Sequence, residues 1–204
     1  MNKLPVHISA GNTKMGAIPS FSLPSGASCS SSACKTCFCE GCYARKLERL
    51  RPSVRNAYAE NFSLAQEDLP ALESYLAWYF DSPNAPRMFR IHVSGDFFSR
   101  EYLDMWLRVI RSHPGTKFLA FTKRYDLFAA IDRETLPENF RLVLSAWPGV
   151  EMPSALLGYY PVAFMQDGRE TRVTADAMPC SGNCSACAKC WDLAGGQSVV
   201  FHKH

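Results

Sequence analysis

The chain has 204 residues, of which 47% are hydrophobic and 20% are charged, enough to bury a full core without disulfides. We therefore expect one domain, residues 1–204. The formal net charge of +3 does not by itself indicate a nucleic-acid-binding protein. No apolar run reaches the ~18 residues of a membrane span. No signal-peptide pattern opens the chain, so we expect a cytoplasmic protein without a membrane partner.

The first part of the chain predicts a short strand, a cysteine-rich loop and a set of helices. The strand follows from the alternation of Leu4, Val6 and Ile8, and the loop spans Cys29 to Cys42. Helices are expected over residues 43–50, 53–66 and 69–80. Ser53 is the expected N-cap of the second helix, after a break at Pro52.

From residue 87 onward, apolar strands alternate with helical segments. The expected strands are 87–93, 117–122, 141–147 and 161–167. The expected helices are 100–112, 124–134 and 152–158. This alternation predicts an α/β fold with a largely parallel sheet, which we interpret as a partial parallel (βα) barrel in a single domain. Its expected parts are an N-terminal strand and cysteine loop (1–44), the βα units (45–170) and a C-terminal cysteine-rich loop segment (171–204).

The predicted strands are followed by polar residues. These are Ser94-Gly95-Asp96, Thr122-Lys123-Arg124, Ser145 and Gln166-Asp167. Because ligands bind at the C-terminal edge of parallel strands, we expect a small-molecule site there. Alternation would place Arg90, His92 and Ser94 on one face, with His92 and Asp96 as acid/base candidates. A hydrogen-bonded histidine in the barrel lumen, and solvated loops for the other residues, remain alternatives.

All nine cysteines fall in two patches. The N-terminal patch holds Cys29, Cys34, Cys37, Cys39 and Cys42, and the C-terminal patch holds Cys180, Cys184, Cys187 and Cys190. Thiols this dense favour metal ligation in a reducing compartment. A secreted disulfide scaffold fits less well, because an odd cysteine is left over.

The C-terminal patch has ferredoxin-like spacing. Cys184, Cys187 and Cys190 are each separated by two residues, and Cys180 can complete the ligand set of a [4Fe–4S] cluster. Zinc sites usually have two separated Cys-x-x-Cys pairs, so zinc is the alternative metal. Trp191 is expected to shield the cluster from water.

The N-terminal patch has more thiols than one cluster needs. Three ligands and an open iron would suit a catalytic cluster, whereas four would suit electron transfer. Zinc is again the alternative. A second cluster is therefore predicted here, with one cysteine to spare.

The run GNTKMGAIPSFSLPSGASC…CYARK, the segment RIHVSGDFFSREYLDMW, the FTKR sequence and the closing C…CxxCxxCW resemble the phage and prophage family known as gene product 88. More distantly, the layout resembles the radical S-adenosylmethionine enzymes. That resemblance implies a cluster at Cys29–Cys42 and a Ser94-Gly95-Asp96 turn that holds the methionyl amino group. Gly-Asp stands here where that superfamily has Gly-Glu, and no cysteine trio has its spacing.

The leading hypothesis is therefore an iron–sulfur enzyme of unknown substrate, with S-adenosylmethionine or another small molecule bound by Ser94, Gly95, Asp96, Thr122, Lys123 and Ser145. A non-enzymatic redox protein is the first alternative. A nucleic-acid-binding protein that uses the basic helical region 45–55 is a variant of it. A structural zinc protein is the third hypothesis.

Overall fold

The computed structural model describes residues 6–29, 42–146, 151–166 and 173–202. Its strands are β1 (Ile8–Ser9), β2 (Ser20–Phe21), β3 (Met88–Ile91), β4 (Lys117–Thr122), β5 (Phe140–Ser145), β6 (Val162–Gln166), β7 (Met178–Pro179) and β8 (Ser198–His202). Its α-helices are α2 (Tyr43–Leu50), α3 (Pro52–Glu67), α4 (Leu69–Phe80), α5 (Arg100–Ser112), α6 (Tyr125–Ala129) and α7 (Cys184–Cys187). Short 3-10 turns are η1 (Arg133–Thr135), η2 (Ser154–Leu156) and η3 (Lys189–Trp191).

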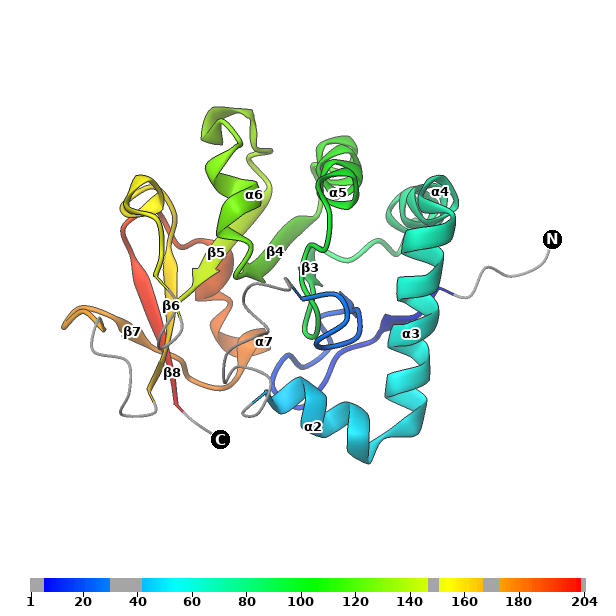
Figure 1. Ribbon diagram of the computed structural model, residues 1–204, viewed down its shortest axis with the longest axis horizontal. Helices are drawn as coiled ribbons and strands as arrows, with labels where there is room; N and C mark the ends of the chain where they lie inside the picture. Colours follow the sequence, from blue (N-terminus) through cyan, green and yellow to red (C-terminus); the bar gives the residue numbers. More distant parts are fainter. Residues whose placement is uncertain (1–5, 30–41, 147–150, 167–172, 203–204) are drawn as a thin grey trace.

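The strands form one sheet in the order β1-β2-β3-β4-β5-β6-β8-β7. Only β1 is antiparallel to its neighbour, and every other neighbouring pair is parallel. From β2 to β6 the strands follow chain order, with α5 and α6 as crossovers after β3 and β4 (Figure 1). The expected α/β fold with a mostly parallel sheet is therefore confirmed.

The strand count expected from the sequence was too low. The sequence predicted five strands, and the sheet also contains β2, β7 and β8. The first two of these are only two residues long, too short to produce a periodic pattern. The strand β8 lies within the segment 171–204, which the sequence predicted to be a cysteine-rich loop. Of the C-terminal cysteines, Cys184 and Cys187 lie in α7 and Cys190 lies in η3.

Three helical segments also differ from expectation. The break before α3 falls at Arg51, and Pro52 occupies the first turn, where a missing N–H costs nothing. Ser53 is therefore inside the helix and is not its cap. The helix expected over 152–158 is only the 3-10 turn η2, and the segment 124–134 divides into α6 and η1.

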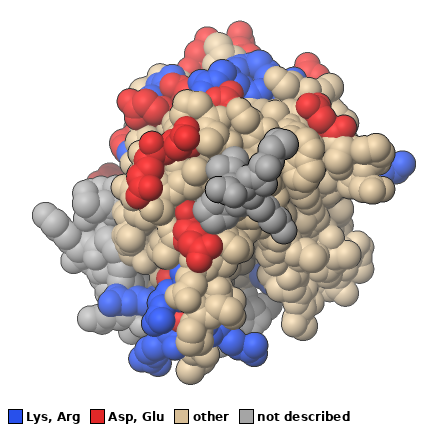
Figure 2. Space-filling view, turned by 90° about the vertical axis from the view of Figure 1, so that its right-hand side faces the viewer, with Lys and Arg blue, Asp and Glu red and all other residues tan. Residues whose placement is uncertain are grey.

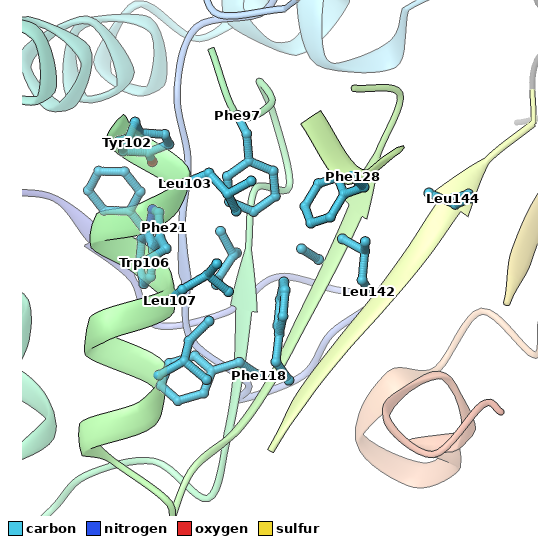
Figure 3. Packing of buried hydrophobic residues seen from close by; sticks show 14 of the residues in the cluster. Phe21, Phe97, Tyr102, Leu103, Trp106, Leu107, Phe118, Phe128, Leu142 and Leu144 are labelled. Carbon is cyan, nitrogen blue, oxygen red and sulfur yellow. The ribbon is translucent and has the colours of Figure 1, made fainter. Parts of the chain in front are cut away.

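The main core lies between the helices and one face of the sheet. Tyr102, Leu103 and Trp106 of α5 are fully buried against Phe89 of β3 and Phe118 of β4. Figure 3 shows Leu103, Trp106 and Phe118 between α5 and the strands. The apolar stripe of α5 was correctly predicted from its spacing, and Ser99 caps this helix by accepting from the backbone N–H of Tyr102.

A second, smaller core lies on the opposite face of the sheet. There Leu119, Val143 and Val199 are covered by Trp191 and Leu193 of the C-terminal segment. The rings of Phe121 in β4 and Phe201 in β8 lie 5.6 Å apart on this face, from which we infer that the face is concave. A flat sheet would separate these strands by about 14 Å, three spacings of about 4.8 Å.

The N-terminal segment is tied to α3 through the buried amide of Asn61. This amide donates to the carbonyl oxygens of His7 and Ser22 and accepts from the backbone N–H of His7. The bonds join His7 and the residue after β2, Ser22, to α3. None of the helices in the described part of the chain is both long and apolar enough to cross a bilayer.

Candidate functional site

The candidate site lies where β2, β3 and β4 end. The chain leaves β2 toward the N-terminal cysteines, leaves β3 through Ser94-Gly95-Asp96 and leaves β4 through Thr122-Lys123. Because β2, β3 and β4 are parallel neighbours, these three exits meet at one edge of the sheet. The predicted convergence of polar strand ends is therefore present for Asp96, Thr122 and Lys123.

Asp96 links the ends of β3 and β4. One carboxylate oxygen accepts from the Thr122 hydroxyl at 2.6 Å and from the Phe97 N–H at 2.8 Å. The other oxygen accepts from the Lys123 N–H at 2.9 Å. The side chain is buried, which raises the pKa of its carboxyl group, and the donated hydrogen bonds act in the opposite direction. The donors of all three hydrogen bonds are groups of the protein itself, in Phe97, Thr122 and Lys123.

Ser94 and Gly95 pack directly against the segment that leads into the cysteines. The N–H of Leu23 donates to the Ser94 carbonyl at 3.0 Å. Gly95 has φ +82, and a Cβ there would lie 2.7 Å from the Leu23 Cβ and would also overlap the Ser28 hydroxyl. Glycine is therefore required both by the backbone conformation and by the close approach of the loop after β2.

Glu48 is a functional-site residue that the sequence interpretation missed. It is buried on α2, and its Oε1 accepts from the Ser25 N–H and the Ser94 hydroxyl, each at 2.9 Å. It therefore connects the start of the cysteine loop, α2 and the turn after β3. Glu48 is the single acidic residue of an otherwise basic helix and lies four positions after the buried Ala44. Residues with this spacing share one face of a helix, which could have indicated that Glu48 is buried.

Cys29 and Cys42 bracket the N-terminal patch, and both are described. They are close enough to interact electrostatically, and Cys29 also interacts with Asp96 and Lys123. Burial is the largest effect and raises the pKa of the Cys29 thiol. Cys34, Cys37 and Cys39 lie outside the described residues. The described part of the patch therefore lies beside Asp96, as the sequence predicted.

His92 does not share a face with Arg90 and Ser94, so that expectation was wrong. It adopts φ 61, a left-handed conformation that interrupts the strand alternation. Its ring stacks on Tyr102 of α5, and Nε2 lies 2.9 Å from the Tyr102 hydroxyl. Burial, with a smaller contribution from the Arg90 charge, lowers the pKa of His92 to about 3. The ring therefore belongs to the helix-side core.

Ser145 lies at the end of β5, one strand beyond Thr122. Its carbonyl oxygen accepts a hydrogen bond from the Tyr125 hydroxyl of α6. This contact is made by the backbone of Ser145 and fixes the direction of the chain as it leaves β5. Gln166 ends β6, and Asp167 lies outside the described residues.

The four C-terminal cysteines line one hollow, together with Met178 and Trp191 among others. Two come from the ends of α7, and Cys190 comes from η3. Between them Ala188 takes a left-handed conformation, φ 50, that turns the chain back. The Asn183 side chain caps α7 by accepting from the Ala186 N–H at 3.2 Å.

The sulfurs of this segment are electrostatically coupled. Burial raises the pKa of Cys190 to about 11, and the thiols of Cys180, Cys184 and Cys187 add to that shift, whereas Arg90 opposes it. Cys187 is the exception, because its pKa is shifted downward. The backbone N–H of Lys189 and the hydroxyl of Ser181 lower the pKa of its thiol. Four interacting thiols on one short segment suit a polynuclear metal centre.

Across the described ranges, no three His, Cys, Asp or Glu side chains converge on a position suited to one metal ion. A zinc ion and a four-iron cluster differ in whether their ligands must converge on a single position. A single zinc ion requires four ligands around one point, whereas the thiolates of a four-iron cluster bind different irons around a larger core.

Comparison with known proteins identifies relatives over nearly the whole chain. The family model described as "Gene product 88" matches residues 5–193. The "Gene 88 protein" of Mycobacterium phage L5 is 32% identical over 220 residues, covering 96% of this chain and 91% of the relative. The "Gene 88 protein" of Mycobacterium phage D29 is 33% identical over 222 residues, covering 96% and 92%. No solved structure matches.

Proposed function

The chain belongs to the gene product 88 family, and we propose that it is a phage- or prophage-encoded iron–sulfur protein with a radical S-adenosylmethionine-like activity. The observation that carries the iron–sulfur part is the shared hollow of Cys180, Cys184, Cys187 and Cys190. These four thiols provide a complete ligand set for one [4Fe–4S] cluster. Buried Trp191 and partly buried Met178 supply the apolar shielding that tunes such a centre.

The enzymatic part of the proposal is supported by the order of the elements at the sheet edge. A cysteine-rich segment follows β2, and the Ser94-Gly95-Asp96 turn follows β3, the next parallel strand. The concave face and the chain-ordered strands favour a partial (βα) barrel. A second cluster would be held by the Cys29–Cys42 patch, with a small molecule bound beside Ser94, Gly95 and Lys123.

Metal and acid-labile sulfide analysis of anaerobically isolated protein tests the cluster proposal. We expect iron and sulfide in equal amounts. Cys184→Ala and Cys190→Ala should each lose one cluster, whereas Ser185→Ala in the same turn should keep the full content. A colourless protein that contains zinc and no iron would instead establish the structural zinc alternative. Single alanine variants of Cys29, Cys34, Cys37, Cys39 and Cys42 would then identify the spare thiol.

Incubation with S-adenosylmethionine and dithionite tests the enzymatic part separately. We expect methionine and 5′-deoxyadenosine as products, and a changed EPR spectrum of the reduced cluster when S-adenosylmethionine is added. Iron-containing protein that gives neither result would remove the radical-enzyme proposal and leave the cluster proposal intact.

A non-enzymatic redox protein is the second candidate, and the geometry of Asp96 favours it. All the hydrogen bonds found for its carboxylate come from Phe97, Thr122 and Lys123, and the side chain is 5% exposed. A carboxylate engaged in this way serves to hold strands together and has little surface for a ligand. Full cysteine ligation of every cluster would support this candidate.

The surface of α2 and the start of α3 favours a nucleic-acid-binding version of this second candidate. Five cations there are exposed: Arg45, Lys46, Arg49, Arg51 and Arg55. Figure 2 shows Lys and Arg side chains gathered at this end of the molecule. The one acidic side chain of α2, Glu48, points into the site and is buried. The helix therefore offers positive charge without local neutralisation.

Binding of a labelled DNA duplex at several salt concentrations tests this version. If α2 contacts phosphates, the triple variant of Arg45, Lys46 and Arg49 to Gln should bind more weakly. It should also flatten the plot of log affinity against log salt, because each lost phosphate contact reduces its slope by about 0.9. The matched control changes Arg87, Arg111 and Arg133 to Gln, on other surfaces. Equal behaviour of the two triple variants would exclude α2 as a specific contact surface.

A further inference from the structure

Two cations lie over aromatic rings on the concave face of the sheet. The ammonium group of Lys14 lies 4.4 Å from the ring centroid of Phe201, and the guanidinium carbon of Arg90 lies 4.1 Å from that of Phe121. The two rings are themselves in edge-to-face contact at 5.6 Å. We call Lys14, Phe201, Phe121 and Arg90 the cation–aromatic row. It joins β3, β4, β8 and the loop after β1.

The cation–aromatic row borders the C-terminal cysteines. Cys180, Cys184 and Cys190 pack against the same apolar cluster as Phe121 and Phe201. The Cys184 N–H donates to the Lys14 carbonyl at 2.7 Å. Two residues further on, Gly16 approaches α7 so closely that a Cβ would lie 2.6 Å from the Ser185 hydroxyl oxygen. The loop that carries Lys14 is therefore fastened to the turn that carries the thiols.

Neither cation of the row is neutralised by a carboxylate in the described part of the chain. The Arg and Lys residues in ion pairs there are Arg100, Arg108, Lys117 and Arg124. Arg90 instead donates from Nε to the carbonyl oxygens of Ile91 and His92. Desolvation lowers the pKa of the guanidinium, and the nearby Tyr43, Cys190 and Cys184 act in the opposite direction. Arg90 is partly buried, and a cation that is partly removed from water without a counter-charge is costly, so an anion is the expected neighbour.

We propose that Lys14 and Arg90 neutralise the net negative charge of the thiolate-ligated cluster at Cys180, Cys184, Cys187 and Cys190 and raise its reduction potential. This inference rests on the proposed iron–sulfur function. Reduction adds one electron to a centre that is already anionic, so a nearby positive charge stabilises the reduced state more than the oxidised state. The aromatic rings keep both cations in place without neutralising them.

The test is an EPR-monitored redox titration of the full chain, purified anaerobically and reduced stepwise with dithionite. The signal of the C-terminal cluster is assigned by its loss in Cys184→Ala. We expect Arg90→Met and Lys14→Met to retain iron and to shift this signal to a more negative potential. A tenfold loss of the reduced form corresponds to about 59 mV for one electron. Arg90→Lys should recover most of the shift.

Arg111→Met is the matched control, since it removes one exposed positive charge on the helix-covered side and should leave the potential unchanged. If iron is retained and neither Arg90→Met nor Lys14→Met moves the potential, this proposal is wrong while the iron–sulfur function stands. If the native protein contains no iron or sulfide, both this proposal and the proposed iron–sulfur function are wrong. Lys14 is only partly buried, so Lys14→Met decides the question if Arg90→Met fails to fold.

Discussion

The hydroxyl group of Thr122 donates a 2.6 Å hydrogen bond to the Asp96 carboxylate, which joins the end of β4 to the turn after β3. The same hydroxyl oxygen accepts from the Arg124 N–H at 2.9 Å. Thr122 is fully buried, so water cannot replace either bond. This pair therefore connects the two strand ends that form the candidate site.

Replacing Thr122 with Val should lower the free energy of unfolding by about 1–3 kcal/mol. The cost arises because the buried Asp96 carboxylate and the partly buried Arg124 N–H each lose a partner while the side-chain volume is kept. Urea denaturation of the two proteins measures the difference. Thr122→Ser keeps the hydroxyl and should cost clearly less. Equal losses for Val and Ser would mean that the methyl group, and not the hydrogen bonds, matters at this position.

Replacing Gly95 with Ala should be far more damaging than replacing Gly26 with Ala. Both glycines have a left-handed backbone, φ +82 and φ +81, so both variants carry the same conformational cost of about 1–2 kcal/mol. Only Gly95 faces Leu23 and Ser28, whereas a Cβ at Gly26 meets nothing within 4 Å. The difference between the denaturation midpoints of the Gly95→Ala and Gly26→Ala variants therefore measures the cost of the clash with the segment that leads into the cysteines. Similar midpoints would show that this contact can relax.

His92 should make the protein sensitive to acid. Its pKa is lowered to about 3 in the folded protein and is about 6.5 in an unfolded chain. Between these values the unfolded state binds a proton that the folded state excludes, so stability falls as pH decreases, by up to about 1.4 kcal/mol per pH unit. His92→Asn tolerates the left-handed backbone and removes this contribution. Stability measured from pH 7 to pH 4 should therefore decline less steeply in the variant.

The comparison between His92→Asn and the native chain cancels the titration of groups that both proteins share. Arg90 and Tyr102 are the titratable neighbours of the ring, and both remain in the variant. Parallel pH profiles would contradict a neutral buried imidazole. A steeper decline in the native chain that begins near pH 6.5 would confirm it.

Replacing Ala188 with Gly should preserve or increase stability, by up to about 1 kcal/mol. Ala188 holds a left-handed conformation between Cys187 and Cys190, which costs an L-residue roughly 1–2 kcal/mol and glycine much less. Ala188→Val should destabilise the protein and reduce its metal content, since a β-branched residue resists this turn. Thermal unfolding and iron analysis check both variants. A stability loss in the glycine variant would show that the Cβ is needed for packing.

Much of the fold follows from patterns within single elements. The stripe of α5 and the apolar strands β3, β4, β5 and β6 were predicted because their side-chain periodicity is local. The two-residue strand β2 was not, since its place depends on pairing with β3 across a long interval of sequence. The location of Asp96 beside Thr122 was predictable because parallel strands end at a common edge.

Local periodicity did not predict the orientation or burial of a side chain where a single backbone angle or a distant contact determines it. The left-handed angle of His92 turns its ring toward Tyr102, which strand alternation cannot reveal. Glu48 appeared to be one more charge on a solvated helix, and its burial depends on Ser25 and Ser94 from two other segments.

The sequence by itself determined where the thiols of this protein lie: all nine fall in two patches, with the spacing on which the iron–sulfur proposal rests. Only the tertiary structure decided what surrounds those thiols. The Asp96 carboxylate accepts hydrogen bonds from Thr122 and Lys123. Lys14 and Arg90 lie over aromatic rings beside the C-terminal cysteines. The physical reason is that ligand spacing is encoded along a few consecutive residues, whereas burial and charge compensation depend on segments that meet only when the sheet forms.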